Sequence, residues 1–207
     1  MSILTKDIIL KAQSGDDWNF GNNILYEMCG RFPSHKEKAQ IIGKVWLIGR
    51  AYAAAIERRK TPDNEISEGD DFYFEQVAPI ILDSDIDFWI QSIEDIDLPD
   101  EKNVARILEV HWRVTNLFFL ISGLEKRSLS SKYLHFHGPK AFFIYDSRAA
   151  ASISKFFSIT GRVEKSDMLC DNEYRKFYMK CLRLQKYIVD EFGIYLPPRA
   201  IDNLLLS

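Results

Sequence analysis

Residues 104–123 read VARILEVHWRVTNLFFLISG, a long apolar stretch in a chain of 207 residues. Its apolar residues include Val104, Leu108, Trp112 and Leu117. Spacings of about four place such residues on one face of an α-helix. Gly123 then ends the pattern, and glycine is the usual residue just past a helix C-terminus. The stretch predicts a long central helix.

Helical signals continue on both sides of this segment. Ser34 and Glu37 fit a capping box, and an apolar stripe follows it: Ile41, Val45, Ile48, Tyr52 and Ile56. Gly43 and Gly49 in that helix suggest close packing of another helix. Residues 172–192 form an amphipathic pattern before Gly193, and Pro197 and Pro198 open a last short helix.

Shorter helices are expected between these long ones. Asp70 and Ser84 are candidate caps for helices over 71–77 and 85–93. Ser128 or Ser130 is expected to cap a short helix, and Asp146 or Ser147 to start one that runs to about Gly161. Only 72–74 and 141–145 have strand-like composition. We therefore predict an all-α fold of about eight to ten helices, as a single helical domain over 1–207 or as two closely packed helical lobes.

The charge is distributed unevenly along the chain. Residues 61–101 hold fourteen acidic residues and no lysine or arginine, whereas 1–60 hold ten basic and six acidic residues. Residues 102–207 hold seventeen basic and ten acidic residues. The acidic insert 61–101 is either a solvated face or the part that turns away while the basic flanks meet a polyanion.

Composition and motifs narrow the class of protein. The N-terminus has an acid too early for a signal peptide, and the longest apolar run, 117–121, is too short for a membrane span. Cys29, Cys170 and Cys181 contain no CxxC pair, which favours reduced thiols in a cytoplasm. Motifs for a nucleotide loop, a serine hydrolase or a zincin are missing. We expect a cytoplasmic protein with no membrane partner, no metal and no cofactor.

Residues 131–148, SKYLHFHGPKAFFIYDSR, carry the functional signal. Lysine and aspartate are rarely buried without a partner, so Lys132 and Asp146 among aromatic residues need an explanation. A lysine in an apolar setting has a lowered pKa and can attack a sugar carbon to form a Schiff base. The plain alternative is an exposed Lys132 with Asp146 as a helix cap.

Other groups with possible chemistry have simpler explanations. His135 and His137 lie two residues apart, so on a helix they point to nearly opposite faces and do not bind one metal ion. Asp83, Asp85 and Asp87 resemble the start of a calcium loop but lack its glycine. The aromatic residues of 156–187 are expected to belong to the core; they are Phe156, Phe157, Tyr174, Phe177, Tyr178 and Tyr187.

The 131–148 segment resembles the helix-hairpin-helix DNA glycosylases, especially the 8-oxoguanine branch. Lys132 matches the family's nucleophilic lysine, and 139–146, PKAFFIYD, matches its proline-to-aspartate connection with Asp146 as the catalytic aspartate. Ser147 and Arg148 fall where the family places residues near the DNA backbone. The resemblance also implies an all-α fold.

Two hypotheses follow. The first is a DNA glycosylase/lyase-like enzyme that takes a base or nucleoside into a cleft, with Lys132 as nucleophile and Asp146 as its partner. Arg148, Lys140 and Arg127 are then candidate contacts to a nucleic acid or nucleotide. The second is a non-catalytic helical interaction protein whose acidic insert docks on a basic protein partner.

Overall fold

The computed structural model describes residues 4–15, 17–58 and 72–207. Within these ranges the chain forms α-helices and short π- and 3-10-helical turns, with no β-strand. The predicted all-α class is therefore confirmed. None of the helices in the described ranges is long and apolar enough to cross a membrane.

The helical elements are spread over both halves of the chain. The N-terminal half contains α1 (Lys6–Ser14), α2 (Asn19–Arg31), α3 (Lys38–Ala51), the π-turn η1 (Tyr73–Val77), α5 (Ala78–Leu82), α6 (Ile86–Gln91) and α7 (Val104–Ser122). The C-terminal half contains α8 (Arg127–His137), α9 (Ser147–Ser152), the 3-10 turn η2 (Ile153–Phe156), α10 (Phe157–Thr160), α11 (Asn172–Phe192) and α12 (Pro198–Leu206).

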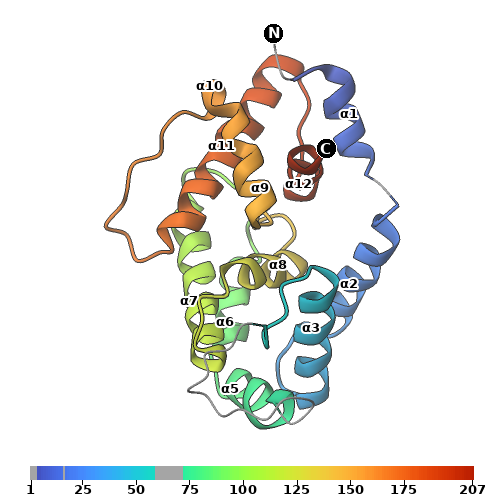
Figure 1. The fold of residues 1–207 in the computed structure, drawn as a ribbon, viewed down its shortest axis with the longest axis vertical. Coiled ribbons are helices and arrows are strands. Elements are labelled where there is room, and N and C mark those ends of the chain that lie inside the picture. Colours follow the sequence, from blue (N-terminus) through green and yellow to red (C-terminus); the bar gives the residue numbers. More distant parts are fainter. Residues whose placement is uncertain (1–3, 16, 59–71) are drawn as a thin grey trace.

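Helix α8 lies near the centre of the molecule (Figure 1). It packs against α2, α3 and α7, while α12 packs against α1 and α9. The helices α1 and α9–α12 lie toward one end in Figure 1, and α3, α5 and α6 lie toward the other. Buried side chains from both ends belong to one hydrophobic cluster.

The predicted central helix is α7, and it ends where expected. Gly123 caps it in the left-handed conformation, with φ of 69°. Its buried face is centred on Val114 and Phe118, with Trp112 only half-buried. The buried face is therefore rotated slightly around the helix axis from the predicted stripe. A large apolar residue such as Trp112 does not by itself show which side of the helix meets the core.

The predicted capping box before α3 is wrong. The helix begins at Lys38 with Glu37 as N-cap, and the Glu37 side chain forms no capping hydrogen bond. His35 is instead buried, and its backbone N–H and Nδ1 both contact the Asp87 carboxylate, at 3.0 and 2.6 Å. Tertiary bonds thus hold this segment extended and override the local cap signal.

The glycines of α3 have different roles. A Cβ on Gly43 would meet nothing within 4 Å, whereas one on Gly49 would come within 3.1 Å of the Ala55 Cα. The close neighbour of Gly49 is the returning chain, not another helix. The turn also places Ala53 at φ of 50°.

The other expected caps have mixed outcomes. Ser84 Oγ donates to the Ile81 carbonyl, and Asp85 is the N-cap of α6 without a side-chain bond. Lys126 rather than a serine precedes α8. Asp70 lies outside the described residues. The C-terminal predictions agree with the structure: α11 ends before Gly193, and Pro198 opens α12.

The strand-like residues 141–145 form an extended segment that has no partner strand among the described residues. The residues Ala141 to Ile144 are almost completely buried. Side chains satisfy their backbone: Tyr178 and Tyr174 hydroxyls donate to the carbonyls of Ala141 and Phe143, at 2.8 and 2.9 Å. On the other side, the Phe142 carbonyl bonds to His135 Nδ1. Side chains of α8 and α11 therefore supply the hydrogen bonds that neighbouring strands would supply in a sheet.

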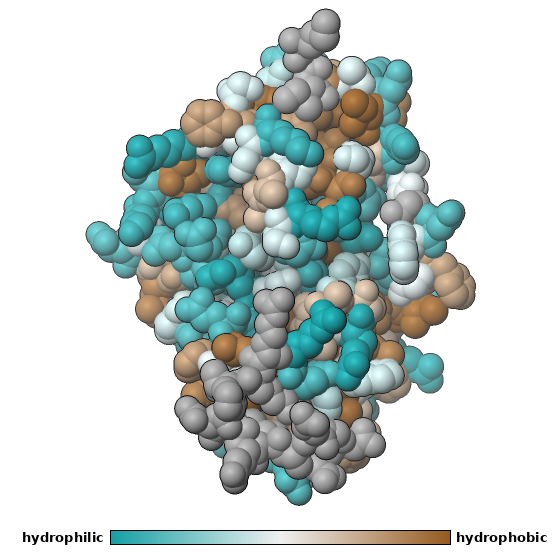
Figure 2. All heavy atoms as spheres, in the orientation of Figure 1, coloured by the Kyte–Doolittle hydropathy of each residue, from teal (hydrophilic) through white to brown (hydrophobic). Residues whose placement is uncertain are grey.

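The surface is mixed on the face that Figure 2 shows, with hydrophilic residues across its middle. Apolar groups gather at the right-hand edge, where α2 lies. Phe20 and Ile24 of α2 are exposed, as is Trp18 just before it. Phe157, expected in the core, is also exposed at 59%, whereas Phe156 and Tyr174 are buried.

The four histidines of the chain make stability depend on pH. Burial lowers the pKa of His35 and of His135 to about 4 and that of His111 to about 3, and it lowers the pKa of His137 well below 6.5. The unfolded chain therefore binds more protons than the native state below pH 6.5. Stability is full above pH 6.5 and falls as pH drops toward 4.

We predict that the free energy of unfolding falls between pH 7 and pH 5, by up to about 1.4 kcal/mol per pH unit for each histidine. Urea unfolding at a series of pH values measures this slope. His111→Phe should reduce the slope of the unfolding free energy against pH by the amount that uptake of one proton contributes. A free energy that stays constant from pH 7 to pH 5 would contradict the assignment of four neutral histidines in the native state.

Candidate functional site

Lys132 lies inside the protein, on the central helix α8. It is 2% exposed. Its Nζ donates to Ser128 Oγ at 2.8 Å and lies 3.6 Å from Asp146 Oδ2. The same nitrogen is 5.8 Å from the centroid of the Tyr52 ring. The ammonium is thus held by a hydroxyl, a carboxylate and an aromatic face.

Asp146 has two structural roles at once. It is the N-cap of α9, where Oδ1 accepts a hydrogen bond from the Ala149 N–H at 2.9 Å. Its other oxygen, Oδ2, is the one near Lys132 Nζ. The cap bond fixes the orientation of the carboxylate through Oδ1, and the ion pair with Lys132 uses the remaining oxygen, Oδ2. The cap and the Lys132 partner are therefore compatible assignments.

The pKa of Lys132 is lowered from its ordinary value because burial disfavours the ammonium, while the negative charges of Asp146 and Asp202 oppose that shift. A lowered pKa increases the fraction of neutral amine near neutral pH. The neutral amine is the form that attacks carbon.

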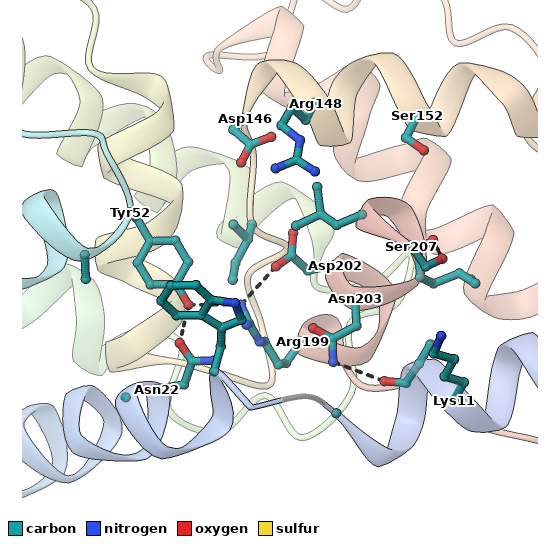
Figure 3. Close-up of a pocket in the computed structure, with 18 of the residues that line it drawn as sticks. Lys11, Asn22, Tyr52, Asp146, Arg148, Ser152, Arg199, Asp202, Asn203 and Ser207 are labelled. Atoms are coloured by element: carbon teal, nitrogen blue, oxygen red, sulfur yellow. Dashed lines mark hydrogen bonds and ion pairs between the residues drawn. The ribbon is translucent and has the colours of Figure 1, made fainter.

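A pocket of about 930 Å³ lies beside this pair. This is within the range of small-molecule sites, about 300–1,000 Å³. Asp146, Arg148 and Tyr52 line it. Lys132 does not line it but lies close to two of these residues, Asp146 and Tyr52. Figure 3 shows Asp146 and Arg148 on one side and side chains from α2 and α12 facing them.

The lining combines apolar walls with a limited number of polar groups. The apolar members include Ile8, Trp18, Leu25, Leu47, Ile144 and Phe156. Lys11, Arg148 and Lys155 add positive charge. The pocket therefore combines apolar contact surface with a few charged groups, as small-molecule sites do.

One wall of the pocket is a chain of hydrogen bonds. Tyr52 Oη donates to Asn22 Oδ1 at 2.6 Å, and Arg199 Nη1 donates to Tyr52 Oη at 3.0 Å. Arg199 Nη1 also donates to Asp202 Oδ2 at 2.9 Å. Figure 3 shows these four side chains joined from α2 to α12. Helix α12 therefore completes the pocket that α2 and α9 begin.

The sequence pattern does not reveal this wall. It assigns Tyr52 to an apolar stripe, and the Tyr52 ring does pack beside Phe136. No sequence pattern around Asn22 marks it as a site residue. The only hint is Arg199 and Asp202, three residues apart on one helix, where opposite charges commonly pair.

The five predicted site residues fall into two groups. Asp146 and Arg148 line the pocket, and Lys132 does not line it but pairs with Asp146. Lys140 Nζ pairs with Asp97 Oδ1 at 2.6 Å, and Arg127 pairs with Asp171 and Glu125. Neither Lys140 nor Arg127 lines the pocket. The nucleic-acid contacts expected for these two residues stay predictions.

The histidines of α8 serve the core. His135 Nε2 lies 2.5 Å from the Tyr26 hydroxyl, and His137 packs against His35 and Tyr133. The described part of the chain contains no group of three or more side chains suited to hold a metal ion.

Comparison with protein-family models, curated proteins and solved structures finds no match for this chain. The functional argument therefore depends on the residues and geometry described above.

The two roles of Asp146 can be separated by substitution. Asp146→Ala removes the cap of α9 and should lower the free energy of unfolding by about 1 kcal/mol relative to Asp146→Asn. Asparagine keeps an oxygen that accepts from the Ala149 N–H. Urea unfolding measures both, with the exposed neighbour substitution Ser147→Ala as control. Equal destabilisation by Asp146→Asn and Asp146→Ala would contradict the cap assignment.

Proposed function

We propose that this protein is a DNA glycosylase/lyase-like enzyme that takes a nucleotide base into the pocket between α2, α9 and α12. The observation that carries the proposal is a buried lysine paired with a carboxylate at the edge of a pocket large enough for a base. The resemblance of residues 131–148 to the glycosylases assigns the same two residues to the same two roles.

The chemistry starts from the neutral amine of Lys132. Its Nζ forms a bond to C1′ of the sugar as the bond from C1′ to the base breaks, and the base leaves with that electron pair and takes a proton from solvent. Asp146 stabilises the positive charge that develops on the sugar. Nζ then loses a proton to water, and its lone pair forms the C1′=Nζ double bond as the C1′–O4′ bond breaks. O4′ keeps that electron pair and takes a proton from water, which leaves a protonated Schiff base on the opened sugar.

Access to the substrate requires a short movement of Lys132. The side chain lies behind Asp146 and Tyr52, and four flexible methylene groups separate its nitrogen from the backbone. Because Asp146 lines the pocket and its Oδ2 lies near Nζ, this carboxylate marks the point where the amine meets the sugar.

Further support comes from the surroundings. Helices α7 and α8 pack together across a four-residue connection, 123–126, so the lysine lies on the second helix of a helical pair. Arg148, Lys155 and Lys11 place positive charge at the pocket that binds the substrate phosphates.

Borohydride trapping tests the proposed nucleophile. DNA carrying an excised-base site should form a covalent adduct with the wild-type protein, because borohydride reduces the Schiff base. Lys132→Met should remove the adduct, and Lys165→Met, which changes an exposed lysine away from the pocket, should keep it. Adduct formation at the wild-type level by Lys132→Met would contradict the assignment.

Arg148 is expected to bind a phosphate. Arg148→Ala should weaken DNA binding and reduce the slope of log affinity against log salt by about one, since one fewer counterion is released. Fluorescence anisotropy at several salt concentrations measures the slope. Arg162→Ala is the control, because Arg162 is exposed, pairs with Glu164 and does not line the pocket.

The alternative is an interaction protein that uses the acidic insert. In the described part of that insert, Asp87, Asp95 and Asp97 each pair within the chain, with His35, Arg106 and Lys140. These pairs leave fewer carboxylates for a basic partner. DNA binding that is absent at every salt concentration would favour this alternative over the enzyme.

A further inference from the structure

A second pocket lies between α5, α6 and α7, and it shares no lining residue with the pocket that Asp146 and Arg148 line. Helices α5 and α6 both pack against α7, and they lie toward the end of the molecule opposite to α12 (Figure 1). This α5–α7 groove has a volume of about 720 Å³. Its large apolar lining residues are Ile80, Trp89, Trp112, Leu117 and Leu120.

The apolar lining of the α5–α7 groove is accessible from outside the protein. Leu120 is 72% exposed, although it lies on the central helix α7. Trp89 and Trp112 are only half-buried, whereas Leu117, one turn before Leu120, is buried. Exposed apolar surface with a polar rim is typical of a site that binds another protein. The groove therefore offers aliphatic and aromatic contact surface to a partner.

The charge at the α5–α6 side of the groove is negative. Asp83 and Asp85 line the groove and are exposed, and neither forms an ion pair with another described residue, unlike the paired carboxylates of the acidic insert. Arg113 also lines the groove, but its Nη2 already lies 2.6 Å from Glu109 Oε1. Residues 61–101 supply no lysine or arginine. The two aspartates are therefore available to a cation from a partner.

We infer that the α5–α7 groove binds a basic amphipathic helix of a protein partner. The apolar face of that helix contacts the tryptophan and leucine side chains, and lysine or arginine beside this face pairs with Asp83 and Asp85. Grooves between helices commonly take such a helix. The described part of the chain has no strand edge to which an extended peptide could add. Two unpaired carboxylates disfavour an acidic helix and the phosphates of a nucleic acid.

The inference goes beyond the proposed enzyme, because the groove contains neither Lys132 nor Asp146. Substitutions in the groove should leave borohydride trapping and DNA binding at the wild-type level. Loss of the enzyme proposal would not affect helix binding, and loss of helix binding would not affect the enzyme proposal. The two proposals can therefore fail separately.

Fluorescence anisotropy of a labelled synthetic peptide tests the inference on the whole chain. The probe is an amphipathic helix with leucine on one face, lysine on both flanks of that face and alanine elsewhere. A second peptide carries glutamate at every lysine position. The wild-type protein should bind the lysine peptide about tenfold or more tightly than the glutamate peptide at low salt, because only the lysine peptide complements the aspartates. Added salt should reduce this difference.

Substitution of the two aspartates tests the charge of the groove. Asp83→Asn combined with Asp85→Asn should weaken binding of the lysine peptide about fivefold, since two exposed ion pairs are lost. The matched control is Glu94→Gln combined with Glu101→Gln. It removes the same charge from exposed acids of the same insert that do not line the groove.

Substitution of one leucine tests the apolar contact. Leu120→Ser should weaken binding of the lysine peptide about tenfold, because a leucine side chain that the helix covers is lost. Leu169→Ser is the matched control, since Leu169 is 56% exposed and does not line the groove. If a groove variant loses its helical circular dichroism, the comparison of the two peptides on the wild-type protein decides.

Three results with the peptides would overturn the inference: equal affinity for both peptides, no binding at millimolar concentration, or equal weakening by the groove and control variants. Analytical ultracentrifugation of the protein alone gives a further test. Self-association that Leu120→Ser abolishes would also overturn the inference, because a second copy of the chain would then occupy the groove.

Discussion

The buried extended segment 141–145 is the constraint on which the candidate site depends. It brings Asp146 next to Lys132, although the two are fourteen positions apart in the chain. A buried backbone must form hydrogen bonds, and here the partners are side chains of α8 and α11 in place of a neighbouring strand. Ser131 on α8 bonds to both the N–H and the carbonyl of Tyr145, at 3.0 and 3.3 Å. The helix that carries Lys132 therefore also fixes the residue just before Asp146.

A comparison of two buried lysines shows why Lys132 stands out. Lys44 is 1% exposed and donates to the carbonyls of Phe32 and Ser34 and lies 3.1 Å from His35 Nε2. Its bonds hold the extended chain before α3, which is a structural role. Lys132 has one hydroxyl partner, Ser128, and one carboxylate partner, Asp146, which also lines the pocket. A buried charge is costly without full compensation, and the carboxylate that compensates Lys132 lines the pocket.

Much of the helical framework can be predicted from the sequence, because glycine stops and apolar periodicity act locally. Gly123, Gly193 and Pro198 mark helix ends that the structure confirms. Asp146 is correctly predicted as a helix start, since aspartate caps well. The capping box at Ser34 fails because His35 has stronger partners, Asp87 and Tyr133, that are distant in sequence.

The candidate site is only half predictable, because part of it also depends on contacts between residues that are distant in sequence. Lys132 and Asp146 stand out as polar residues in an apolar segment, whereas no local pattern connects residue 22 with residue 199. Charge in the sequence also does not show which cations face a pocket and which, like Lys140 and Arg127, are already paired with nearby acids.

The central claim is that burial lowers the pKa of Lys132 and that Asp146 opposes this shift. Nuclear magnetic resonance of lysine side chains, titrated in the wild-type protein and in Asp146→Asn, tests it most directly. The pKa of Lys132 should lie below the ordinary value of 10.5 and fall further in Asp146→Asn, because Asp146 favours the ammonium. A Lys132 pKa at 10.5 or above, unchanged in Asp146→Asn, would contradict the account.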